Sequence, residues 1–289
     1  MDTTAYTVYL EKMGKSRNTI LAYCKDIEIF AKEIGGAGAE KDLATVTNTE
    51  IVSYVLRLKN DGASASTINR KLSSLRTYFY FLLAQGKISE DPTVGIKAPK
   101  VAERDIEFLS MDEVDRLMQA PDDSVKGLRD KAILELMYAT GIRASELIEI
   151  KIADVNTRMG MLVCQTKARV IPFGKPERLA LEEYINHSRD IILGEGESGY
   201  LFLNYNGTPL SRQGLWKILK DYAGKAEIEG PFTPKTLRNS FAVHMLQNGA
   251  DLKTVQKLMG HDDISATEVY LSATTQRIKD VYDKTHPRA

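Results

Sequence analysis

Apolar residues recur at helical spacing along most of this 289-residue chain, in two blocks separated by one interruption. The helix expected over residues 19–32 has four such residues on one face: Ile20, Tyr23, Ile27 and Phe30. A longer apolar stripe follows over residues 66–84, in which Ile68 and Leu72 are spaced one helical turn apart. Because helices of this kind each bury one stripe, the chain is expected to fold mainly from packed helices.

The interruption predicts the domain organisation. Between Ile96 and Glu107 the helical spacing disappears, and Pro99 with the surrounding charges disfavours a continuous helix. We therefore predict an N-terminal helical domain over residues 1–98, a linker over 99–108 and a larger domain over 109–289.

Local signals place the remaining elements. Capping-box patterns, in which Thr or Ser is followed three residues later by Glu, occur at Thr47 and Ser110 and predict helix starts. Strand-forming residues over 160–164 and 169–173 predict a short β-hairpin in the second domain. A helix is expected to start near Arg143 or Ala144, and the other helices are expected over residues 47–58, 112–120, 125–139, 177–187, 212–226, 236–247, 252–259 and 274–283.

The composition is typical of a globular protein that is not inserted in a membrane. There is no apolar run of transmembrane length and no signal-peptide pattern at the start, so a cytoplasmic location is expected. The two cysteines, Cys24 and Cys164, lack metal-ligand or redox spacing and are interpreted as reduced thiols, with a disulfide as the less favoured alternative. The 39 basic and 39 acidic residues balance, so binding to nucleic acid requires that the basic ones gather on one face.

Residues suited to phosphoryl transfer gather in four segments: ATGIRASELIEI (139–150), CQTKARVIPF (164–173), 233–261 and ISATEVYL (264–271). They offer arginines, lysines, a histidine and a tyrosine at element ends or turns. Guanidinium groups pair with the oxygens of a phosphate transition state, and a tyrosine hydroxyl can form a covalent intermediate. These segments therefore indicate chemistry on a phosphodiester.

The sequence resembles the tyrosine recombinase (phage integrase) family, and within it the Xer type. The resemblance covers nearly the whole chain, and GIRASELIEI with LRNSFAVHMLQNGADLKTVQKLMGH is its most specific part. It implies an N-terminal SAM-like, core-binding helical bundle and a larger, mostly helical catalytic domain with a small β-sheet or hairpin.

The resemblance also implies roles for individual residues. Arg143 and Arg238 look like the two arginines that clamp the scissile phosphate, and His261 looks like a further phosphate donor. Tyr270, about nine residues beyond His261, looks like the nucleophile, and Tyr282 is its nearest rival. Glu146 resembles a position that supports the site.

Two lysines complete the set that the resemblance implies. Lys167 looks like the hairpin lysine that protonates the departing 5′ oxygen, and Arg169 is its competitor. This hairpin is shorter than the usual Xer pattern, which has a Gly-Lys-Gly phrase. Lys235 stands where the family normally has histidine, and it is expected to be a phosphate donor and a possible base.

DNA contacts are expected from both domains. Arg212 and Gln213 open a predicted helix and suit major-groove readout, because arginine pairs with guanine and glutamine with adenine. The other candidates for DNA contact are Arg17, Asn18, Asn69, Arg70, Arg76 and Arg169. A solvated helix face remains the alternative for each.

The function expected from the resemblance is site-specific recombination of double-stranded DNA through a 3′-phosphotyrosyl bond, for DNA integration or for chromosome dimer resolution. No cofactor or metal is expected, since the ester conserves the bond energy and the sequence has no metal-binding or phosphate-loop motif. The partners implied are three further protomers on two DNA sites, with docking of residues 274–289 on a neighbour. A second recombinase, as in paired Xer systems, is a further candidate partner. The alternatives are a type IB topoisomerase-like nicking enzyme and a DNA-binding regulator that has lost catalysis.

Overall fold

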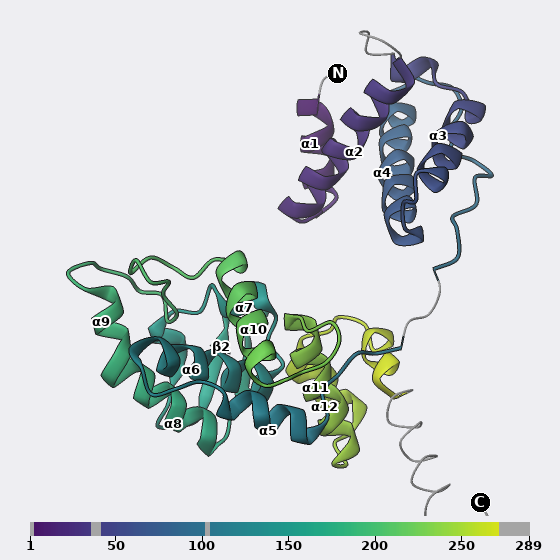
Figure 1. The fold of residues 1–289 in the computed structure, drawn as a ribbon. Helices are drawn as coiled ribbons and strands as arrows, with labels where there is room; N and C mark the ends of the chain where they lie inside the picture. Colours follow the sequence, from purple (N-terminus) through teal and green to yellow (C-terminus); the bar gives the residue numbers. More distant parts are fainter. Residues whose placement is uncertain (1–2, 36–41, 102–104, 272–289) are drawn as a thin grey trace, which may run out of the picture. The chain divides into compact units, whose positions relative to one another are not determined.

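The computed structural model describes residues 3–35, 42–101 and 105–271, and the chain divides into two compact units, Met1–Glu103 and Arg104–Ala289. Figure 1 shows that helices dominate both units. The expectation of a mainly helical protein is confirmed. The predicted helix over 274–283 lies outside the described residues.

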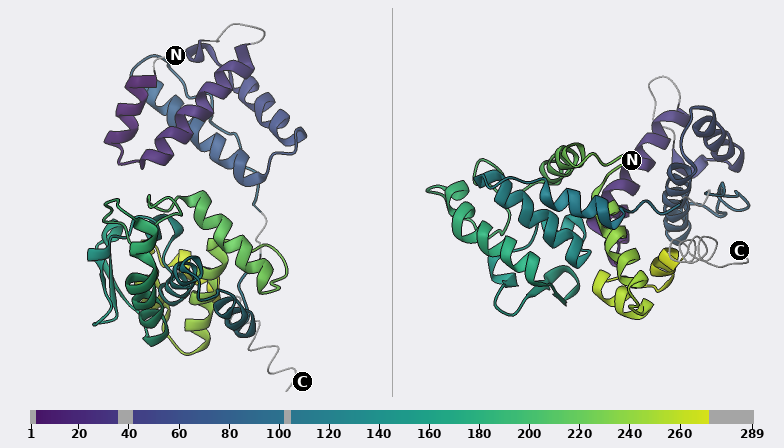
Figure 2. Two further views of the ribbon diagram at one scale, coloured as in Figure 1. Left: turned by 60° about the vertical axis from the view of Figure 1, so that its left-hand side comes forward. Right: turned by 60° about the horizontal axis from the view of Figure 1, so that its bottom comes forward.

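The described residues of the first unit form four α-helices and a short 3-10 helix, Leu43–Thr45. The α-helices are α1 (Thr3–Lys12), α2 (Arg17–Gly35), α3 (Asn48–Asn60) and α4 (Ala65–Ala84). Thr47 starts α3 with the capping box that the sequence predicts, because its hydroxyl accepts from the Glu50 amide while the Glu50 carboxylate accepts from the Thr47 amide. Figure 2 shows these helices from two further directions.

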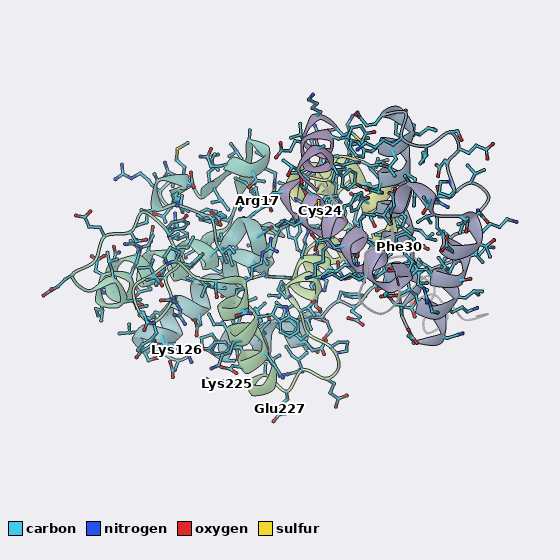
Figure 3. The ribbon with its side chains drawn as sticks, turned by 90° about the horizontal axis from the view of Figure 1, so that it is seen from above. Arg17, Cys24, Phe30, Lys126, Lys225 and Glu227 are labelled. Atoms are coloured by element: carbon cyan, nitrogen blue, oxygen red, sulfur yellow. The ribbon has the colours of Figure 1, made fainter. Side chains whose placement is uncertain are left out.

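Aromatic side chains fill the core of this first unit. Tyr6, Phe30, Tyr54 and Phe79 are almost fully buried, and Phe30 meets the ring of Tyr54 edge-on at 4.9 Å between centroids. Figure 3 marks Arg17, Cys24 and Phe30, which follow one another along α2. Helix α1 was not among the predicted helices. It buries Tyr6 and Leu10 against the other helices, so packing stabilises a short segment that lacks a clear helical stripe.

The second unit is built around two long helices, α6 (Val125–Thr140) and α11 (Pro234–Gln247), which are buried over much of their length. Helix α8 (Lys175–Tyr184) packs on α6 and continues through a π-helical turn, Ile185–Arg189, into α9 (Asp190–Leu193). The other labelled α-helices in the described part of this unit are α5 (Met111–Gln119), α7 (Ala144–Leu147), α10 (Arg212–Lys225) and α12 (Leu252–Met259). Residues 265–271 are also helical, and Ser110 caps α5 as predicted.

The β structure of the second unit is a three-stranded antiparallel sheet in the order β1-β2-β3. Strands β2 (Met161–Cys164) and β3 (Arg169–Pro172) form the predicted hairpin, with Leu162 opposite Ile171. Strand β1 (Val155–Asn156) was not predicted, because two residues are too few to show an alternating pattern.

No helix among the described residues is long and apolar enough to cross a membrane. Within the same part of the chain, no group of three or more His, Cys, Asp or Glu side chains is arranged to hold a metal ion. The thiols of Cys24 and Cys164 are both free, as the sequence led us to expect.

Candidate active site

Four segments of the second unit meet at one cavity. They are the entry segment 105–107, the N-terminal half of α11, the turn after α12 and the helical residues 265–271. The turn after α6 adjoins them through the hydrogen bond that Arg238 donates to the Gly141 carbonyl. Figure 1 shows α11 and α12 side by side, with the last described residues next to them. The cavity has a volume of about 410 Å³, and its lining includes Lys235, Arg238, Asn239, His261 and Tyr270.

Two glycines with positive φ make this convergence possible. Gly141 ends α6 at φ 57° and turns the chain toward Arg143, and a Cβ added there would lie 2.4 Å from the ring of Phe241 on α11. Gly260 ends α12 at φ 63°, and its added Cβ would lie 2.8 Å from the Arg169 guanidinium. Glycine therefore permits both the left-handed backbone and the close packing.

Glu146 organises the arginines on one side of the site. Its carboxylate accepts two hydrogen bonds from the Arg169 guanidinium, each 2.9 Å, and one from Arg143 Nη1 at 3.1 Å. Burial alone would raise the pKa of Glu146, but hydrogen bonds from Arg169 and Arg143 outweigh it and lower the pKa to about 2. The carboxylate is therefore ionised at any working pH, and it holds both arginines in fixed orientations.

Arg143 and Arg238 bracket the turn that follows α12. Arg143 Nη2 donates to the Gly260 carbonyl at 3.0 Å, and Arg238 Nη2 donates to the Met259 carbonyl at 2.7 Å. Arg238 also donates to the Gly141 carbonyl and is only 8% exposed. Burial, with the nearby Arg143 charge, lowers the pKa of Arg238 to about 10, so it still carries its charge near neutral pH.

The hydrogen bonds of His261 define its tautomer. Its Nε2 lies 2.9 Å from Arg238 Nη2, and its Nδ1 lies 2.8 Å from the hydroxyl of the buried Thr267. Because a guanidinium can only donate, Nε2 is the acceptor and Nδ1 carries the proton. Thr267 therefore fixes the orientation of the ring.

Tyr270 lies in the same cavity and is 5% exposed. Its ring stacks on His261 at 6.5 Å between centroids, and its hydroxyl donates to Asn239 Oδ1 at 3.1 Å. Burial raises the pKa of Tyr270, while the charges of Arg238 and Arg143 oppose that effect. The structure thus brings the hydroxyl and both arginines, which are far apart in the sequence, into one neighbourhood.

The two predicted lysines differ in what the structure describes. Lys235 is exposed in the first turn of α11 and lines the cavity. Lys167 lies in the 3-10 turn Gln165–Lys167 between β2 and β3, where the structure describes its backbone but not its side chain.

The DNA-contact candidates of the second unit fall into two groups. Arg212 and Gln213 are exposed at the start of α10, whose other end is marked by Lys225 and Glu227 in Figure 3. Arg169 is different from what we expected of a DNA contact. Its side chain is 10% exposed and is occupied by Glu146 and by the Leu258 carbonyl, so its contacts favour a structural role.

In the first unit, Arg17 and Asn18 are exposed at the start of α2. The candidates on α4 make contacts within the unit. Arg70 pairs with the buried Asp26, Arg76 donates to the Ile96 carbonyl at 2.5 Å, and Asn69 donates to the Pro99 carbonyl at 3.1 Å. Arg70 remains 45% exposed despite its ion pair.

Sequence reasoning missed two residues that hold the site together, Asn239 and Thr267. Asn239 directly follows Arg238 on a buried helix, and Thr267 lies one helical turn before Tyr270. Those neighbours were the only signals in the sequence, and a polar residue beside an expected site residue is too common a pattern to be decisive.

Comparison with known proteins identifies the family. Residues 107–277 match the phage integrase family, and residues 4–86 match its N-terminal SAM-like domain. The chain belongs to the phage integrase family. The tyrosine recombinase XerD of Listeria monocytogenes serotype 4b (strain F2365) is 42% identical over 283 residues, which cover 96% of this chain and 95% of that protein. The Xer-type resemblance is thus confirmed, and this integrase-family chain is a tyrosine-type site-specific recombinase.

Solved structures agree on the fold of this recombinase. The Tn1549 transposon integrase in complex with transposon right end DNA has a TM-score of 0.75 at 20% identity, with 98% of each chain covered. A lambda integrase tetramer bound to a Holliday junction has a TM-score of 0.70 at 21% identity, covering 92% of this chain and 75% of that one. At these identities the likeness concerns the fold alone.

Proposed function

We propose that this recombinase cleaves and rejoins DNA at specific sites with Tyr270 as its nucleophile. The observation that carries the proposal is the cavity that Tyr270 shares with Arg238, His261 and Lys235. A phosphate in this cavity would meet cationic donors next to a tyrosine hydroxyl. The relatives named above are recombinases, which favours this function over the regulator and the topoisomerase-like enzyme.

In the proposed reaction, the Tyr270 oxygen attacks the phosphorus of a phosphodiester and displaces the 5′ oxygen of the next nucleotide. The phenolic proton passes to a base, and the departing oxygen takes a proton from a general acid, for which Lys167 is our candidate. A 5′ hydroxyl of a partner strand then attacks the 3′-phosphotyrosyl bond and releases Tyr270. One ester replaces another at each step, so the exchange needs no outside source of energy.

Arg143 and Arg238 would stabilise the transition state in this scheme, and His261 would join them as a donor once its Nε2, which accepts from Arg238 in this structure, is protonated. Negative charge grows on the non-bridging oxygens, and preorganised donors lower the barrier because they need no rearrangement at that moment. The bonds of the two arginines to backbone carbonyls, and of Arg143 to Glu146, supply that preorganisation.

The Lys235 position departs from the family pattern, and we propose that it donates to the phosphate and serves as the base. Lys235→Ala is expected to slow cleavage by about 10²-fold or more, because a positioned proton acceptor typically contributes that much. Lys235→His should restore part of the cleavage rate. The rate of this variant should rise as the pH increases through about 6.5, where free histidine loses its proton. Single-turnover formation of the DNA adduct between pH 5.5 and 9 measures both effects.

Lys126→Ala serves as the control for Lys235, since Lys126 is exposed at the start of α6 and does not line the cavity. Its cleavage rate should equal that of the wild type. A full rate in Lys235→Ala would remove the lysine from the mechanism.

The wider assembly also belongs to the proposal. The solved lambda integrase forms a tetramer on a Holliday junction. By analogy we propose four protomers on two DNA sites, with or without a second recombinase, acting in the cytoplasm. The segment 274–289, to which we assign docking on a neighbour, lies outside the described residues.

Recombination of a two-site plasmid tests the proposed function. The sites come from sequencing the DNA that is trapped covalently on the protein in cells. The wild type should give recombinant products, together with a protein–DNA adduct that survives denaturing electrophoresis. Relaxed plasmid with an adduct but no recombinants would favour the topoisomerase-like enzyme, and specific binding without an adduct would favour the regulator.

A further inference from the structure

The side-chain amide of Asn239 links Tyr270 to the segment through which the chain enters the second unit. Its Oδ1 accepts from the Tyr270 hydroxyl at 3.1 Å, and its Nδ2 donates to the Glu107 carbonyl at 2.9 Å. Asn239 is 4% exposed and Tyr270 is 5% exposed. The hydrogen bond to Tyr270 is thus buried, which strengthens it, and the one to Glu107 is partly buried.

The chemistry of the two partners fixes the orientation of this amide. A backbone carbonyl can only accept, so the NH₂ group of Asn239 must face Glu107. The oxygen of the amide then faces Tyr270, and the hydroxyl must donate its hydrogen to it. An amide oxygen is not a base, so this hydrogen bond has to break before the phenolic proton can be transferred.

We infer that Asn239 is a latch that holds the Tyr270 hydroxyl in its protonated, resting form until the site is engaged on DNA. The inference rests on the proposed function and concerns the regulation of the same site. The latch stabilises the state before cleavage but not the transition state, because the hydrogen bond to Asn239 requires the hydrogen of the Tyr270 hydroxyl. Asn239 is accordingly a positioning residue.

The neighbouring residue of α11 anchors the same entry segment. Ser240 Oγ accepts from the Leu109 amide at 2.8 Å, two residues beyond the carbonyl that Asn239 holds. Successive residues of one buried helix therefore fix residues 107–109. A shift of this segment relative to α11 would move the Glu107 carbonyl and could break its hydrogen bond to Asn239. The position of the entering chain would thereby affect the hydrogen bond between Asn239 and the Tyr270 hydroxyl.

Burial and nearby charges shift the pKa of Tyr270 in opposite directions. Burial, the largest effect, raises this pKa, whereas the charges of Arg238 and Arg143 lower it. A hydrogen bond that only the neutral phenol can donate adds to the raising effects. The titratable groups that line the same cavity from the surrounding elements are Lys235, Arg238, His261, Asp105 and Glu107.

A pair of substitutions at Asn239 tests the latch. Asn239→Ala and Asn239→Asp both lose the donor to Glu107, but only aspartate keeps an acceptor for Tyr270 and adds a negative charge. With a nicked DNA substrate in single turnover, Asn239→Ala should form the adduct about fivefold faster than the wild type, the size expected for one hydrogen bond of the resting state. Asn239→Asp should form it more slowly than the wild type.

The titration of Tyr270 supplies a readout that does not depend on activity. In protein labelled with ¹³C at the ring carbon that bears the hydroxyl, the signal missing in Tyr270→Phe belongs to Tyr270. Its pKa should fall in Asn239→Ala and rise in Asn239→Asp. Asn248→Ala, at the exposed end of the same helix, should change neither the rate nor the titration.

The outcomes separate the latch from the proposed function. Slower cleavage in both Asn239 variants with an unchanged titration would make Asn239 merely structural and overturn the latch. Equal rates in the wild type and Asn239→Ala would do the same. A wild type that forms no adduct at all would contradict the proposed function, and the Tyr270 titration would then still report on the hydrogen bond.

Discussion

Tyr270→Phe is expected to bind its DNA site as tightly as the wild type and to form no covalent adduct, a loss of more than about 10⁴-fold in cleavage. The substitution removes a single oxygen. The ring that stacks on His261 stays, and the hydrogen bond to Asn239 is lost. Stability should therefore fall by only about 1 kcal/mol. A nicked substrate followed by denaturing electrophoresis measures the adduct, and a gel-shift titration measures the binding.

Tyr184→Phe is the matched control for this experiment. Tyr184 is fully buried in the same unit, and its hydroxyl donates to the Leu201 carbonyl at 2.9 Å, so the control also removes one buried hydrogen bond. It should form adduct at the wild-type rate. An adduct in Tyr270→Phe would assign the nucleophile to another of the 13 tyrosines, and Tyr282, which lies outside the described residues, would be examined first.

Arg238→Lys should slow cleavage by about 10²- to 10³-fold, the range found when one preorganised donor is removed from an active site. The positive charge remains in this variant. A lysine cannot donate to the Gly141 and Met259 carbonyls and to His261 with the geometry of a planar guanidinium. Single-turnover cleavage at saturating DNA isolates the chemical step from binding.

The loss of a buried arginine also lowers the stability of the fold, and Arg189→Lys is the control for that effect. Arg189 is 4% exposed and likewise donates to backbone carbonyls, among them those of Ser198 and Tyr200. Both variants should melt at a lower temperature than the wild type, but only Arg238→Lys should lose cleavage when assayed well below its melting temperature. Equal cleavage rates in the two variants would show that Arg238 acts only through folding.

Helix positions followed from the sequence because their signals are local. The Thr47 and Ser110 capping boxes each involve residues three apart, and the apolar stripes repeat within single helices, so neither depends on the rest of the fold. Helix α1 and strand β1 were missed for the same reason. Their stability comes from tertiary packing, of which a short segment carries no local sign.

The candidate site divides in a similar way. The sequence alone determined a mainly helical chain. Through its resemblance to the integrase family it also predicted the candidate catalytic residues Arg143, Lys167, Lys235, Arg238, His261 and Tyr270. Only the tertiary structure decided that Arg169 is occupied by Glu146, 23 residues away in sequence, and that Asn239 holds both Tyr270 and the Glu107 carbonyl, 31 and 132 residues away. Hydrogen bonds between such distant residues depend on where each side chain lies in three dimensions, and no spacing along the chain records that.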